Sequence, residues 1–127
     1  ELKEGVNHCQ LIDDSYNNDL AGLQVSIDFL TNQQQRSKKT LILSDVLQSG
    51  VHPRQWVQQV AEMIRQNKIE RFIGVGPYLS EHQSFFSGIT QFFISTEDFL
   101  EHLKDDDFSN EIILIKGARP FAFEKIV

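Results

Sequence analysis

The chain alternates short, almost unbroken apolar runs with stripes of apolar residues at helical spacing, and this alternation limits its possible folds most strongly. Five runs are predicted strands: residues 9–14, 40–45, 69–75, 90–95 and 111–116. Two helical stripes comprise Leu20, Leu23, Ile27 and Leu30, and then Trp56, Val57, Val60, Ala61 and Ile64. Apolar strands that alternate with amphipathic helices indicate a largely parallel sheet covered on both faces. We therefore expect a Rossmann-like, three-layer α/β/α fold with a mostly parallel sheet of five or six strands.

Smaller signals complete this outline. Residues 1–4 are expected to pair with the first strand as a hairpin arm, and residues 78–88 to form a weaker helix or a loop. Thr96 begins a short helix whose apolar face is Phe99, Leu100 and Leu103, and residues 121–127 resemble the first turns of another helix. No repeat or interior linker interrupts residues 1–127, so one domain is predicted. Because the chain starts at Glu1 rather than Met, we expect a processed chain or a piece of a longer one.

Composition excludes several classes of function. The net charge is −6 and the basic residues are scattered, which argues against nucleic acid as a partner, since binding phosphates needs clustered positive charge. The single Cys excludes an internal disulfide and a zinc site of two or four cysteines. No apolar run approaches the roughly 18 residues of a membrane span, so a soluble chain without a membrane partner is expected. The single Cys suits a reducing cytoplasm, which is the predicted location.

Charged residues follow the predicted strands, where parallel sheets bind ligands. Asp13 and Asp14 end the first strand and either accept hydrogen bonds from a ligand, hold Mg²⁺ or cap a turn. Asp45 ends the second strand and taken alone is a loop carboxylate. Lys116 and Arg119 flank a glycine after the last strand, a position suited to gripping a carboxylate, although a solvated pair of cations is the alternative.

Other motifs are incomplete. The stretch 74–76 reads Gly-Val-Gly but lacks the third glycine of a dinucleotide fingerprint and follows the third strand rather than the first. The P-loop pattern GxxxxGK[ST] does not occur, and the four histidines lack the spacing of metal ligands. The sequence thus predicts neither a P-loop nucleotide site nor a metal site in this chain.

Three stretches together resemble one family. Residues 11–17 read LIDDSYN, residues 43–50 read LSDVLQSG and residues 116–119 read KGAR. They are similar to DDSYNANP, GDMxELG and KGSR in the carboxy-terminal domain of Mur ligases, in the branch that adds D-alanyl-D-alanine. The order is the same over essentially the whole chain. Departures such as Ser44 for Gly and Ala118 for Ser resemble Bacteroidetes-type ligases that are fused to an alanine racemase domain.

The resemblance implies an ATP-dependent amide ligase of peptidoglycan synthesis, which joins D-Ala-D-Ala to a UDP-N-acetylmuramoyl tripeptide through an acyl phosphate. In that family an amino-terminal domain holds the UDP-sugar, and a central domain carries the P-loop, ATP and Mg²⁺. The carboxy-terminal domain brings the dipeptide and closes over them. It follows that this chain by itself is expected to be inactive.

The resemblance also implies roles for individual residues. Asp14 matches a carboxylate that faces the ATP ribose, with Tyr16 and Asn17 on the same loop near the nucleotide. Asp45 matches the GDM carboxylate and is expected to bind the ammonium group of the dipeptide. Arg119, supported by Lys116, is expected to bind its carboxylate.

A signalling receiver domain is the alternative. Such domains have a five-strand α/β sheet, and Asp13 and Asp14, Thr96 and Lys116 fit the positions of the receiver's acidic pair, hydroxyl and lysine, which together would hold Mg²⁺ and phosphate. The template fails at the phosphoacceptor, because no Asp ends the third predicted strand, residues 69–75.

Overall fold

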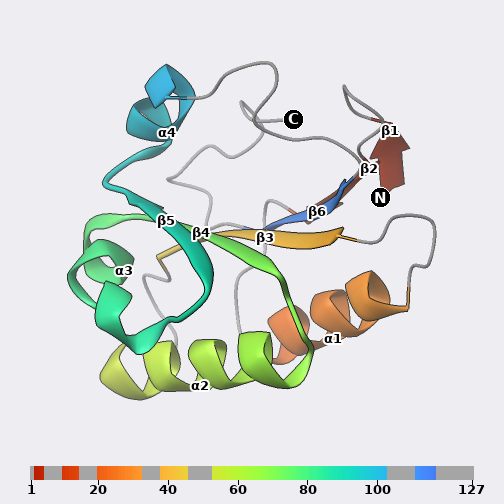
Figure 1. Ribbon diagram of the computed structural model, residues 1–127, viewed down its shortest axis with the longest axis horizontal. Coiled ribbons are helices and arrows are strands. Elements are labelled where there is room, and N and C mark those ends of the chain that lie inside the picture. The colour runs from red at the N-terminus through yellow and green to blue at the C-terminus, as the bar shows by residue number, and fades with distance from the viewer. Residues whose placement is uncertain are drawn as a thin grey trace.

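A single mixed sheet forms the centre of the computed structural model, which describes residues 2–4, 10–14, 20–32, 38–45, 53–102 and 111–116 (Figure 1). The strands are β1 Leu2–Glu4, β2 Gln10–Asp14, β3 Lys38–Ser44, β4 Arg71–Val75, β5 Ile89–Phe93 and β6 Glu111–Lys116. The helices are α1 Leu20–Thr31, α2 Pro53–Gln66, α3 Pro77–Glu81, the 3-10 helix η1 Gln83–Phe85, and α4 Thr96–His102.

The sheet order is β1-β2-β6-β3-β4-β5, so the last strand in sequence lies in the middle of the sheet. β1 pairs with β2 in antiparallel orientation, and every other pairing is parallel. This confirms the mostly parallel α/β sheet and the hairpin arm at residues 1–4. All six residues of β6 are buried, as expected of a strand that is covered on both faces.

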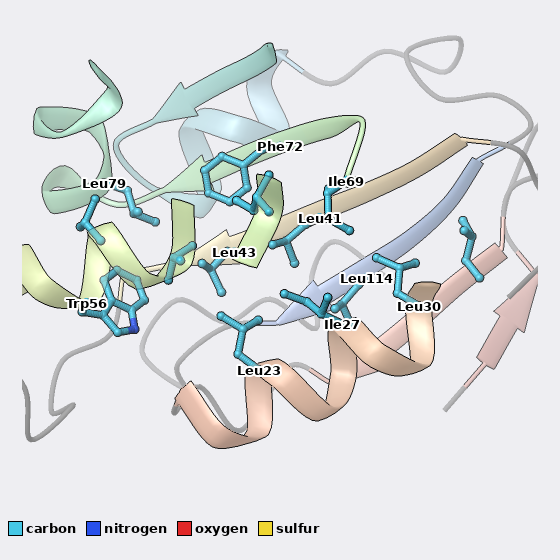
Figure 2. Close-up of a cluster of buried hydrophobic side chains, with 14 residues drawn as sticks. Leu23, Ile27, Leu30, Leu41, Leu43, Trp56, Ile69, Phe72, Leu79 and Leu114 are labelled. Atoms are coloured by element: carbon cyan, nitrogen blue, oxygen red, sulfur yellow. The ribbon is translucent and has the colours of Figure 1, made fainter. Parts of the chain in front are cut away.

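The two faces of the sheet carry separate apolar layers, because successive strand residues point to opposite sides. In one layer, Leu41, Leu43 and Leu114 pack against α1 and α2 (Figure 2). In the other layer, Ile42, Ile73, Ile113 and Ile115 pack with Phe99 of α4. Figure 1 shows α1 and α2 below the sheet and α4 above it, which makes the three layers that the sequence predicts.

The helical stripes are buried as their spacing indicates. Leu23, Ile27 and Leu30 of α1 are fully buried, as are Val57 and Val60 of α2, with Trp56 2% exposed. Ala61 lies at the edge of its stripe and is half-buried. Burial of each large side chain contributes roughly 1.5–3 kcal/mol, so these stripes supply much of the stabilisation of one layer.

Some predicted boundaries shift or lie beyond the described residues. The third predicted strand begins at Arg71 rather than Ile69, and residues 78–88 divide into α3, η1 and a turn. Leu103 and residues 121–127 fall outside the described part of the chain. None of the described helices has the length and apolar character needed to cross a membrane.

Candidate functional site

The carboxyl ends of the five parallel strands meet along one edge of the sheet. The register pairs Lys116 of β6 with Asp14 of β2 on one side and with Leu43 of β3 on the other. Asp45 follows β3 directly, and its backbone N–H donates to the carbonyl of Val75 at 2.9 Å. The fold therefore brings the backbone positions of Asp14, Lys116 and Asp45 to the same edge. Three other predicted site residues, Tyr16, Asn17 and Arg119, lie outside the described residues.

Asp45 is held by the start of α3. Its Oδ2 accepts a hydrogen bond from the backbone N–H of Tyr78 and its Oδ1 accepts one from Leu79, both at 2.8 Å. These N–H groups belong to the first turn of α3, where no carbonyl within the helix can accept them. Asp45 is only 5% exposed and thus caps a helix from the neighbouring strand. The sequence analysis did not predict this contact.

Gly76 makes this contact possible. It has φ of +136°, and a Cβ at this position would lie 2.3 Å from Cγ of Asp45. A side chain is excluded here by the close approach of the carboxylate as well as by the backbone conformation. The second glycine of the Gly-Val-Gly stretch, which fails as a dinucleotide motif, is therefore needed for this close contact. In the sequence, Gly76 followed by Pro77 was the signal that could have predicted it.

Burial dominates the electrostatics of Asp45. Loss of solvent raises the pKa of its carboxyl group above 3.8, while the hydrogen bonds from Leu79 and Tyr78 lower it. Glu81 raises the pKa further through charge repulsion. A carboxylate in this position gains electrostatically from any cation that reaches it.

Lys116 is the last residue of β6 and is completely buried. It lies two residues after Leu114 and therefore on the sheet face that α1 and α2 cover. A buried ammonium group requires compensation by hydrogen bonds or opposite charge. Lys116 is therefore a buried cation at the carboxyl edge of the sheet rather than a mobile surface cation.

Two further contacts stiffen the edge at β5. The backbone N–H of Gly76 donates to the carbonyl of Phe93 at 2.7 Å. Ser95 caps α4, since its Oγ accepts from the backbone N–H of Asp98 at 3.0 Å. Thr96, which the receiver template uses as a ligand residue, is 1% exposed.

The strand order contradicts the receiver alternative. Counted without the hairpin arm, the parallel strands in chain order are β2, β3, β4, β5 and β6, and they lie in the order first-fifth-second-third-fourth. Receiver domains have the order second-first-third-fourth-fifth. The structure also ends β4 at Val75 with no carboxylate at the phosphoacceptor position.

Mg²⁺ is the metal that the resemblance implies for the complete ligase. Within the described ranges no three His, Cys, Asp or Glu side chains come together to hold an ion.

Comparisons with known proteins agree with this geometry. No family model matches the chain. A UDP-N-acetylmuramoyl-tripeptide--D-alanyl-D-alanine ligase from Bacillus subtilis is 24% identical over 132 residues, which span 100% of this chain and 29% of the relative. Two crystal structures of MurF from Acinetobacter baumannii superpose with TM-scores of 0.78 and 0.76 at 19% and 18% identity. Each match covers 99% of this chain and 28% of the MurF chain, so these relatives are much longer proteins that share this fold.

Proposed function

We propose that this chain is a Mur ligase C-terminal domain and forms the dipeptide-binding part of an ATP-dependent peptidoglycan ligase. The sequence relative and the structural relatives support this proposal. One observation carries the proposal: the register sets Lys116 and the end of β3 side by side at the carboxyl edge of the sheet. The chain also aligns along its full length with a UDP-N-acetylmuramoyl-tripeptide--D-alanyl-D-alanine ligase. The proposed partners are D-Ala-D-Ala, ATP and a UDP-N-acetylmuramoyl tripeptide. A fused alanine racemase domain and a cytoplasmic location belong to the same proposal.

The charges at this edge suit a dipeptide zwitterion. β3 and β6 are hydrogen-bonded neighbours, and adjacent strands lie roughly 4.8 Å apart. Two extended residues span at most about 7 Å, so a dipeptide can reach from an anion after β3 to a cation after β6. We assign the ammonium group to Asp45 and the carboxylate to Arg119, with Lys116 in support.

Asp45 can combine this role with its contact to α3. Each oxygen of a carboxylate offers about two acceptor positions, and the backbone bonds from Tyr78 and Leu79 use one on each. Because those bonds fix the plane of the carboxylate, the remaining lone pairs have a defined direction. The helix contact would therefore orient Asp45 toward the amine rather than compete with it.

The loop after β2 is assigned to the nucleotide. Asp14 ends β2 beside Lys116, and Tyr16 and Asn17 follow on the same loop. When bound, ATP would supply the phosphoryl group that converts the carboxylate of the UDP-linked tripeptide into an acyl phosphate. The contribution of this chain is to hold the dipeptide amine in position and to exclude water on closure, which lowers the barrier through orientation.

Kinetics of an Arg119→Ala variant test the proposal. In the complete ligase that carries this domain, we expect KM for D-Ala-D-Ala to rise at least tenfold, since a charged hydrogen bond is worth roughly 1.5–3 kcal/mol, while KM for ATP stays unchanged. Arg65→Ala is the matched control, because Arg65 is an exposed arginine at the far end of α2. Equal changes in both KM values, or no change in either, would contradict the assignment.

A further inference from the structure

The indole of Trp56 contains a buried hydrogen-bond donor without an acceptor. Trp56 is 2% exposed. Its Nε1 is buried and has no hydrogen-bond partner. Every other buried side-chain nitrogen or oxygen of the described residues has one. An N–H that loses water without gaining a partner destabilises the fold, so such a group needs an explanation.

Its place in the fold connects Trp56 with the candidate site. α2 begins at Pro53, shortly after the end of β3, and Trp56 lies in the first turn of this helix. The ring packs in the same apolar layer as Leu43 and Leu79. In the view of Figure 2, the nitrogen of Trp56 lies on the edge of the ring that is turned away from the labelled Leu79.

Two residues of the same apolar layer connect the ring with the ligand edge. The backbone N–H of Leu79 binds Asp45, and Leu43 is the register partner of Lys116. Trp56 and Lys116 thus share one sheet face at the carboxyl ends of the strands. Both side chains offer only hydrogen-bond donors, and the matching ligand group is a carboxylate, which is an acceptor alone.

We infer that Trp56 is a substrate-binding residue whose Nε1–H donates to a carboxylate oxygen of the peptide ligand when that ligand enters the edge. The inference rests on the proposed function and adds a specificity residue to it. It also explains why an indole occupies a core position that a phenyl ring would fill without leaving an N–H unpaired.

Trp56→Phe tests the inference, since it removes the N–H and keeps an aromatic ring. In the complete ligase, we expect KM for D-Ala-D-Ala to rise about tenfold with KM for ATP unchanged, and the denaturation midpoint to stay level or rise. Ile64→Val is the control for disturbance of the core, because Ile64 packs in the same layer toward the other end of α2. This control should lower the midpoint and leave both KM values as they are.

A second readout uses the 127-residue chain, in which Trp56 is the only tryptophan. Saturating D-Ala-D-Ala should shift or quench its fluorescence, and an equal concentration of D-alanyl-D-alaninol, which carries a hydroxymethyl group in place of the carboxylate, should not. If the wild-type ligase uses the dipeptide but Trp56→Phe keeps the same KM, Trp56 is purely structural and the inference is wrong. If the wild-type ligase does not use the dipeptide, the proposed function itself is wrong.

Discussion

At the scale of single residues, the carboxylate of Asp45 does more than its position in the sequence suggests. It accepts two backbone hydrogen bonds of 2.8 Å from the first turn of α3 and so joins the end of β3 to the helix that follows β4. The contact depends on Gly76, because no side chain fits between that backbone and the carboxylate. The geometry of the candidate site therefore depends on a residue that has no chemistry of its own.

Gly76→Ala measures this dependence. The Cβ would meet Asp45 at 2.3 Å in a backbone with φ of +136°, and we expect the free energy of unfolding to fall by about 3 kcal/mol. Gly88→Ala is the matched control, since Gly88 has φ of +86° but nothing within 4 Å of its Cβ position. Urea denaturation measures the loss of stability in both variants. Gly88→Ala reports the backbone strain alone, and the additional loss in Gly76→Ala reports the clash with Asp45. Equal losses at the two positions would show that the contact contributes nothing.

At the scale of elements, most helices and strands follow from local pattern, and their ends follow from backbone chemistry. α2 ends in a Schellman motif, with hydrogen bonds from Ile69 N–H to the carbonyl of Ile64 at 3.1 Å and from Lys68 N–H to Arg65 at 3.4 Å. Lys68 occupies the left-handed position of this motif, with φ of 55°, where glycine is usual. The apolar contact between Ile64 and Ile69 in the same core layer explains how the motif forms without glycine.

Lys68→Gly should therefore stabilise the chain. A left-handed conformation costs a residue with a Cβ roughly 1–2 kcal/mol, of which part is offset by the greater freedom of glycine in the unfolded chain. We expect a gain of about 1 kcal/mol in the free energy of unfolding, measured by urea denaturation. Lys68→Ala removes the same charge but keeps a Cβ, and it should change stability by less than about 0.5 kcal/mol. An equal gain from both variants would assign the effect to charge instead of backbone.

At the scale of the whole molecule, the central position of β6 organises the ligand edge. At the opposite edge, Glu111 of β6 is 2% exposed and accepts a hydrogen bond from Thr40 of β3. Arg71 of β4 lies 3.5 Å from the same carboxylate, so three strands share one buried polar contact. Breaking such a pair by removing one partner is strongly destabilising, and the contact favours the observed register of β6.

The chain as given should fold without catalysing the proposed reaction. It matches only 28–29% of the length of its relatives, and it contains no P-loop motif to hold nucleotide phosphates. We expect neither phosphate release from ATP nor amide formation by the 127-residue chain, with the complete ligase as the positive control. Turnover by this chain alone would refute the proposed division of labour.

Much of the molecule follows from the sequence by itself. The apolar runs and helical stripes specify the strands, the helices and their buried faces, because burial of a stripe such as Leu23, Ile27 and Leu30 depends only on local periodicity. Charges after the strands also predict which edge binds ligands, since parallel strands end together. The predicted roles of Tyr16, Asn17 and Arg119 stay predictions, as these residues lie outside the described part of the chain.

Only the tertiary structure decided the order of the strands and the contacts between their ends. Local pattern carries no information on which strand lies beside which. The position of β6 between β2 and β3 is therefore known only from the folded sheet, and this strand order is what excludes a receiver domain. The contact of Asp45 with α3 and the unpaired N–H of Trp56 likewise arise between segments distant in sequence. Periodicity determines which side a residue faces, whereas its neighbours across the sheet depend on the packing of the whole chain.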